Sequence, residues 1–208
     1  MKAFIRAFVA LVVLLAVLGS VVAYTVARRG FSTRSEPSAV EELLARTMRR
    51  LATPSDVRTM PNPVQPTREV LEDGLEHFAD HCASCHANNG SGDTEIGRGL
   101  YPPAPDMRAA PTQELSDGEL FSIIENGIRL TGMPAWGTGT PESQRASWAL
   151  VHFIRRLPSL AEDEIARMEQ LNPKTAEQWR EEDEARRFLA GEDVEPAPAA
   201  PHEHDGSR

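Results

Sequence analysis

The sequence predicts an all-α protein, because every regular element that it indicates is a helix. Three observations carry this prediction: a long uncharged apolar run near the N-terminus, apolar residues at helical spacing further on, and helix-capping sequences at several of the expected starts. The expected helices cover residues 7–27, 38–51, 67–81, 117–126, 140–157, 161–171 and 175–190.

The first of these helices has the length of a membrane span. Ala7 to Ala27 is 21 residues without a charge, and such a helix reaches about 30 Å, the hydrocarbon thickness of a bilayer. We expect a retained single-pass anchor. The alternative is a cleaved signal peptide with a small-residue site at 21–23 or 25–27, which the length of the run disfavours.

Charge is distributed unevenly along the 208 residues, whose net charge is −9. Residues 1–35 hold five basic and no acidic residues, whereas residues 159–208 hold fourteen acidic and six basic ones. Because the chain has no basic stripe, we expect no nucleic-acid partner. The only lysines are Lys2 and Lys174, so a docking surface in the middle of the chain cannot depend on lysine.

Composition divides the chain into four expected segments. The second contains a capped amphipathic helix followed by four prolines, and the last ends in an acidic, Pro/Ala-rich tail from Val194 that we expect to be disordered. The segments are an N-terminal membrane anchor (1–35), a stalk helix with a Pro-rich linker (36–66), a central domain (67–158) and an acidic helical extension with its tail (159–208).

The central domain contains Cys82-Ala83-Ser84-Cys85-His86, the C-x-x-C-H attachment signature of a c-type haem. The thiols of Cys82 and Cys85 can each form a thioether to a haem vinyl group, and His86 is placed to offer its imidazole to the iron. A thioredoxin-like redox pair would need a βαβ context, and a zinc site would need two further ligands at finger-like spacing. The sequence offers neither.

Two helices of this domain are expected to cross at Gly74. A glycine inside a helix costs about 1 kcal/mol relative to alanine, and a second helix packed against the bare backbone would offset that cost. Phe78 would pack beside the crossing. The partner that we expect is helix 140–157, whose stripe of Trp148, Val151, Ile154 and Leu157 is apolar.

Residues 87–112 are rich in glycine and proline, so we expect a loop without regular elements, wrapped around a haem edge. A proline carbonyl in this loop can accept a hydrogen bond from the second ring nitrogen of His86. Pro102, Pro103 and Pro105 are all candidates, and the sequence does not choose among them.

Met133 is the candidate for the second axial ligand. It lies in Gly132-Met133-Pro134, in a loop between two apolar helices, and its thioether would raise the reduction potential relative to a second imidazole. The alternative is an ordinary core methionine. Nearby, Trp136 and Arg129 are candidates to contact a haem propionate.

The other histidines are expected to have different roles. We expect His77 and His81 to face solvent and His152 to be a hydrogen-bonded histidine at the edge of the core. His202 and His204, in Pro-His-Glu-His-Asp, could bind a metal ion weakly, although a solvated tail is the simpler interpretation.

Together, Gly74-x-x-x-Phe78-x-x-x-Cys82-Ala-Ser-Cys85-His86 and the later Gly132-Met133-Pro134 resemble a class I mono-haem cytochrome c over residues 67–158. They are similar to domains in membrane-bound dehydrogenase and haem–copper oxidase cytochrome subunits of Gram-negative bacteria. The resemblance implies a small all-α fold, one covalent haem c with His86 and Met133 as axial ligands, and one-electron transfer without enzyme activity. The anchor, the lysine-free middle and the acidic extension depart from soluble cytochromes.

We therefore expect a one-electron carrier in the bacterial inner membrane, with its haem domain in the periplasm and with redox proteins as donor and acceptor. Haem attachment on the periplasmic side decides this orientation, although the basic residues flanking the span weakly oppose it. One alternative is a haem-based gas sensor or peroxidase-like domain with a displaceable distal ligand. Another is an accessory or assembly subunit that docks through residues 159–208.

Overall fold

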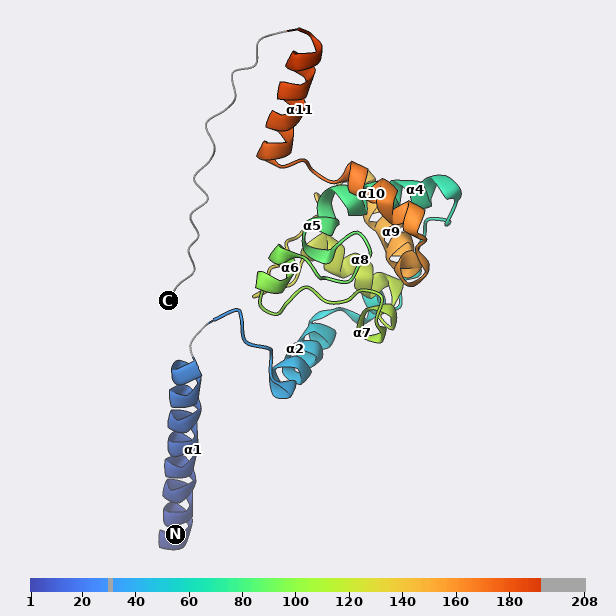
Figure 1. The fold of residues 1–208 in the computed structure, drawn as a ribbon. Helices are drawn as coiled ribbons and strands as arrows, with labels where there is room; N and C mark the ends of the chain where they lie inside the picture. Colours follow the sequence, from blue (N-terminus) through green and yellow to red (C-terminus); the bar gives the residue numbers. More distant parts are fainter. Residues whose placement is uncertain (30–31, 192–208) are drawn as a thin grey trace. The chain divides into compact units, whose positions relative to one another are not determined.

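The computed structural model describes residues 1–29 and 32–191 (Figure 1). Every regular element in these residues is helical, as the sequence predicts. The expected disordered tail, with His202 and His204, lies outside the described residues. The elements are α1 (Lys2–Arg29), α2 (Ala39–Ala52), α3 (Ser55–Arg58), α4 (Arg68–His77), the π-helical turn η1 (Phe78–Cys82), α5 (Ala83–His86), α6 (Glu95–Gly99), α7 (Ala110–Gln113), α8 (Asp117–Asn126), α9 (Pro141–Arg156), the 3₁₀ turn η2 (Leu157–Ser159), α10 (Glu162–Leu171) and α11 (Ala176–Leu189).

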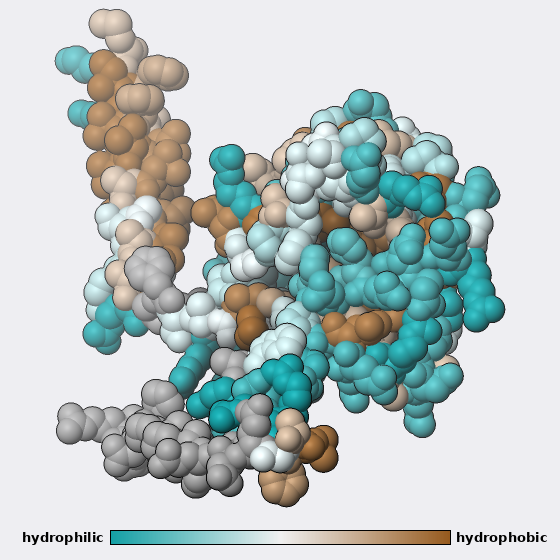
Figure 2. Space-filling model, turned by 90° about the horizontal axis from the view of Figure 1, so that it is seen from above, coloured by the Kyte–Doolittle hydropathy of each residue, from teal (hydrophilic) through white to brown (hydrophobic). Residues whose placement is uncertain are grey.

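Helix α1 is long and apolar enough to cross a bilayer. The span from Lys2 to Arg28 has a mean hydropathy of 2.7, and none of its most apolar stretch is buried against the rest of the chain. Figure 2 shows its middle as an uninterrupted hydrophobic surface. A retained anchor and a signal segment would both have this length and hydropathy.

The helix starts follow their capping sequences. The hydroxyl of Ser116 accepts a hydrogen bond from the N–H of Glu119 at 3.1 Å, and the Glu119 carboxylate accepts one from the N–H of Ser116 at 2.9 Å. Ser38 and Glu41 form the same reciprocal pair at the start of α2. Helix α9 has Thr140 as its N-cap, followed by a proline at its first position.

Helices α4 and α9 cross where Gly74 has no side chain, as the sequence predicts. A Cβ at Gly74 would lie 2.6 Å from the carbonyl oxygen of Ala149 and 2.9 Å from Cβ of Phe153. Real Cβ atoms essentially never approach other atoms so closely, so only glycine permits the crossing at this separation. The glycine that weakens α4 locally is thus the residue that lets it pack.

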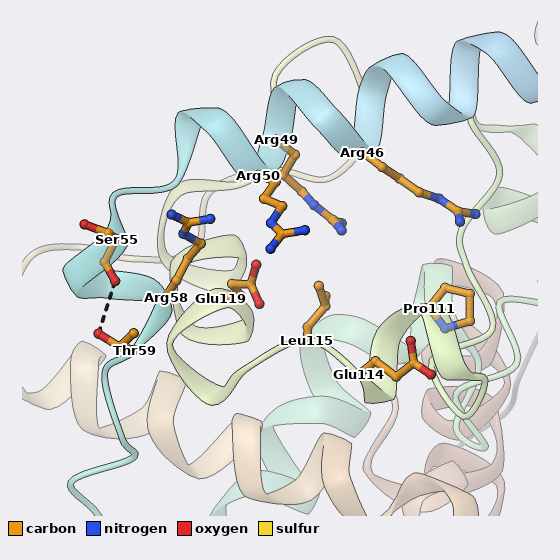
Figure 3. A pocket seen from close by; sticks show the side chains of 10 residues that line it. All are labelled: Arg46, Arg49, Arg50, Ser55, Arg58, Thr59, Pro111, Glu114, Leu115 and Glu119. Atoms are coloured by element: carbon orange, nitrogen blue, oxygen red, sulfur yellow. Dashed lines mark hydrogen bonds between the residues drawn. The ribbon is translucent and has the colours of Figure 1, made fainter.

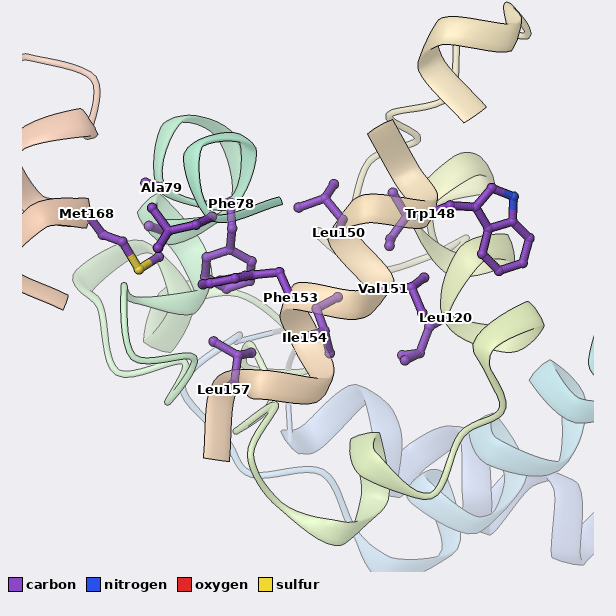
Figure 4. Packing of buried hydrophobic residues seen from close by; sticks show 13 residues of the cluster. Phe78, Ala79, Leu120, Trp148, Leu150, Val151, Phe153, Ile154, Leu157 and Met168 are labelled. Atoms are coloured by element: carbon purple, nitrogen blue, oxygen red, sulfur yellow. The ribbon is translucent and has the colours of Figure 1, made fainter. Parts of the chain in front are cut away.

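The core is built on this crossing (Figure 4). Phe78 and Phe153 are buried and their ring centroids lie 5.2 Å apart. On the other side of α9, Trp148 stacks on Phe121 with centroids 4.1 Å apart. Met168 of α10 has no exposed surface and joins the same cluster, so α10, which the sequence groups with the acidic extension, packs against the domain.

The glycine- and proline-rich segments contain more structure than expected. Residues 87–112 include the short helix α6 and the start of α7, and the Pro-rich linker contains α3. Helix α3 packs on α8, where a Cβ at Gly118 would clash with the backbone of Val57. The linker also meets α9, because the side chain of Asn62 donates to the carbonyl of Trp148 at 3.0 Å.

A second compact unit begins at Asn172. Its helix α11 starts with a capping box between Thr175 and Gln178. Lys174 pairs with Glu182 at 2.6 Å, and its ammonium nitrogen lies 5.0 Å from the ring centroid of Trp179. The exposed apolar side chains of this helix are Trp179, Phe188 and Leu189.

Gly74→Ala should destabilise the domain by about 1–3 kcal/mol, the usual cost of overpacking, because the new methyl group forces α4 and α9 apart. Denaturant unfolding of the haem-loaded protein measures this loss. Gly99→Ala in α6 is the matched control, since a Cβ there meets no atom within 4 Å. Equal stability of the two variants would contradict the crossing.

Candidate haem-attachment site

The two cysteines and His86 lie where the helix that starts at Arg68 passes through a π turn and then into the short helix α5. The N–H of Ala83 donates to the carbonyl of Phe78, five residues earlier. The sequence predicts a plain α-helix to His81, whereas the structure gives the wider turn from Phe78 onward. The extra residue changes the angular position of Cys82 relative to Gly74, and π turns are common at functional sites.

Cys82 and Cys85 are unpaired thiols, both partly buried. Burial and, to a smaller extent, the neighbouring Cys85 together raise the pKa of Cys82 to about 12. At neutral pH the thiol of Cys82 is therefore protonated. Two thiols one helical turn apart can each form a thioether to a haem vinyl group, and each thioether uses up one S–H.

His86 is buried, with 9% of its surface exposed. Burial lowers the pKa of its imidazole, so the neutral ring, which is the form that can bind a metal, is favoured. The carbonyl of Pro105 acts against this effect as an acceptor beside the ring. Nδ1 of His86 is buried and makes no hydrogen bond. Of the three prolines that the sequence left open, Pro105 is the one that acts on His86.

The loop after the motif is fixed to the motif's own backbone. The N–H of Gly92 donates to the carbonyl of His86 at 2.9 Å, and the hydroxyl of Thr94 donates to the carbonyl of Cys85 at 3.2 Å. Gly92 has a φ of +74°, and a Cβ there would lie 3.0 Å from the carbonyl oxygen of Pro105. Glycine at this position lets the backbone that carries Pro105 approach the histidine.

The loop that contains Met133 is held against the last turn of α8. The N–H of Ile128 donates to the carbonyl of Met133 at 3.1 Å, and the N–H of Trp136 donates to the carbonyl of Ile124 at 3.0 Å. Met133 is partly buried. A Cβ at Gly132 would lie 2.6 Å from the side chain of Leu100, so the loop also packs on the segment that follows the motif.

The aromatic residues around the motif correct one expectation. His77 is exposed as predicted, but His81 is partly buried and stacks on Trp136, with ring centroids 5.2 Å apart and an interplanar angle of 20°. Trp136 is 39% exposed, so it packs against His81 rather than standing free. His152 is hydrogen-bonded as predicted, with its Nε2 2.7 Å from the carbonyl oxygen of Val64.

The residues at this site fit a covalently attached haem. Two thiols without another partner precede a buried imidazole that is favoured in its neutral form and whose Nδ1 makes no hydrogen bond. Cys82 and Cys85 would hold the porphyrin by thioethers and His86 would bind its iron. Bound in this way, a haem supplies an iron centre that accepts and releases one electron.

A family model described as cytochrome c oxidase, cbb3-type, subunit III matches residues 69–154. The match includes the C-x-x-C-H motif, Met133 and the crossing of α4 with α9. These residues form a mono-haem cytochrome c domain of this family. The cytochrome c domain is an electron-transfer domain, and its cysteine motif implies one covalent haem c.

Two residues that shape the site of this cytochrome c domain were not predicted from the sequence. Thr94 and Gly97 both meet the carbonyl of Cys85, Thr94 through a hydrogen bond and Gly97 through a close approach where a Cβ would clash. The signal was present, because Thr94 is the N-cap of α6 and accepts from the N–H of Gly97 at 2.8 Å. Arg129, a candidate for a propionate contact, is exposed.

Gly92→Ala should destabilise the haem-loaded domain more than Gly139→Ala. Both residues have a positive φ, but a Cβ at Gly139 meets no atom within 4 Å. Gly139→Ala should therefore cost only the left-handed backbone penalty of about 1–2 kcal/mol. Gly92→Ala should cost about 1–3 kcal/mol more, because it also pushes against Ala104 and Pro105.

Denaturant unfolding of both variants measures this difference. Equal losses would show that the backbone of Pro105 is not held against Gly92.

Proposed function

We propose that the chain is a membrane-anchored cytochrome c that carries single electrons on the periplasmic side, with His86 and Met133 as the two axial ligands of its iron. Its donor and acceptor are redox proteins at the membrane. Holding one imidazole and one thioether in both oxidation states means that little has to rearrange when the electron moves.

The fixed position of the loop of residues 128–137 supports Met133 as the second axial ligand. Its backbone is bonded to the end of α8, and Thr131 orients Met133 by accepting from its N–H at 3.1 Å. A methionine on a fixed loop loses little freedom when its sulfur binds, so a thioether ligand there is retained in both redox states. Met133 also lies in the part of the chain that matches the family model.

The proposed attachment to the membrane rests on α1. Its length and hydropathy suit a span, and a covalent haem requires the domain to be on the side where bacteria attach it. We infer that α1 stays on the mature protein as a single-pass anchor. Mass spectrometry of the mature chain tests this directly, and a mass that lacks the first helix would contradict it.

Met133→Leu should leave the haem covalently bound but remove the weak sulfur–iron absorption band at the red end of the spectrum. It should also lower the reduction potential, because a thioether ligand favours Fe(II). Absorption spectroscopy of the oxidised protein and a redox titration measure the two effects.

Met107→Leu is the control, since Met107 packs beside the core and should keep both the band and the potential of the parent. Absence of the band from the parent protein would refute Met133 as ligand. Rapid and complete binding of carbon monoxide by the reduced parent would instead favour a sensor or peroxidase-like domain with an open distal site.

A further inference from the structure

Helix α2 presents an apolar face that the rest of the described chain leaves uncovered. No residue of α2 is buried, and its apolar side chains recur at the spacing of one helix face. Between 58% and 77% of each of these side chains is exposed to solvent. They are Val40, Leu43, Leu44, Met48 and Leu51. Five large apolar residues on a single exposed face are more than scattered surface residues explain.

The polar side of α2 borders a cleft lined by arginines (Figure 3). The cleft has a volume of about 630 Å³ and lies between α2, α3 and the start of α8. Its arginines, three from α2 and one from α3, extend from these helices toward the cleft in Figure 3. They are Arg46, Arg49, Arg50 and Arg58.

The charges in this cleft are not balanced. Two carboxylates line it, and that of Glu119 already accepts a hydrogen bond from the N–H of Ser116 at 2.9 Å. Arg46 is paired with Glu42 at 2.9 Å. Nε of Arg58 is buried without a hydrogen-bond partner. A buried guanidinium donor without an acceptor is costly, and the planar fork of arginine donors matches the oxygens of a phosphate group.

The chain itself brings a lipid surface within reach of α2. Helix α1 ends at Arg29 and α2 begins at Ala39. Ten residue steps extend at most about 35 Å, so α2 must lie near the membrane that α1 spans. An amphipathic helix in that place typically lies in the interface, with its apolar face about 5–10 Å into the boundary between headgroups and acyl chains.

We propose that α2 lies along an anionic lipid surface, with its apolar face in the acyl boundary and headgroup phosphates bound by the arginine cleft. At that depth the phosphates lie beside the flanks of the helix, where Arg46 and Arg50 emerge. The proposal rests on the proposed function, because it requires α1 to remain as an anchor. Together, α1 and α2 would attach the cytochrome c domain to the membrane at two points.

Spin labels on the two sides of α2 test the proposal in the full, haem-loaded chain. Both native cysteines are used for haem attachment, so Leu44→Cys and Ala45→Cys each introduce the only free thiol. The protein is placed in vesicles of phosphatidylcholine with and without phosphatidylglycerol. The label at residue 44 should collide more with oxygen than with a water-soluble nickel chelate, and the label at residue 45 should do the reverse.

Two results would overturn the proposal. Equal nickel access at both positions would place the apolar face in water, and shielding of the residue 44 label from both reagents would indicate contact with protein, such as a second copy of the chain. Leu51→Cys, on the same face, repeats the test if the change at Leu44 impairs folding.

Changing the charge of the lipid and of the arginines tests whether the cleft binds headgroup phosphates. Phosphatidylglycerol should increase the immersion of the residue 44 label, and Arg46→Gln combined with Arg50→Gln should abolish that increase. Arg180→Gln combined with Arg186→Gln on α11 removes the same charge and should leave the increase unchanged. Inorganic phosphate added to neutral vesicles should not reproduce the increase; if it does, the cleft binds a soluble anion and the lipid assignment is wrong.

The proposed anchor and the inference about α2 can be contradicted separately. A mature chain whose mass lacks α1 contradicts the proposed function. A chain that keeps α1 but exposes the residue 44 label to nickel contradicts only the inference about α2.

Discussion

The structure depends on one close contact, the approach of α4 to α9 at Gly74. The backbone of Ala149 occupies the place that any side chain at Gly74 would take. Because the helix that starts at Arg68 runs on through the π turn into α5, fixing α4 also fixes where Cys82 and His86 lie. The large aromatic side chains of the core pack around this crossing, so stability and the position of the haem site have the same origin.

The elements that could be predicted from the sequence have local signals. Capping boxes at Ser38 and Ser116 and the proline at the start of α9 are read from neighbouring residues, and the structure has helices at all three. The crossing at Gly74 was also predictable, since a glycine inside a helix needs a reason. The C-x-x-C-H motif indicates its cofactor because the sequence supplies neither the βαβ context of a redox pair nor the further ligands of a zinc site.

What the sequence could not predict depends on contacts between distant residues. Pro105 is distinguished from the two other prolines only by where the loop carries its carbonyl, which in turn depends on the positive φ of Gly92. Thr94 caps α6 through a local hydrogen bond, but its second bond, to the carbonyl of Cys85, forms only because the loop folds back on the motif. Met168 enters the core although its own helix is mostly charged. None of these has a periodic pattern in the sequence.

Covalent attachment of a haem to Cys82 and Cys85, beside His86, can be tested on the haem itself. The purified protein is extracted with acidified acetone, and a tryptic peptide spanning residues 82–86 is examined by mass spectrometry. We expect the red colour to stay with the precipitated protein and the peptide to carry the mass of one haem. If the colour leaves with the solvent and the peptide has two free thiols, Cys82 and Cys85 do not bind a haem covalently.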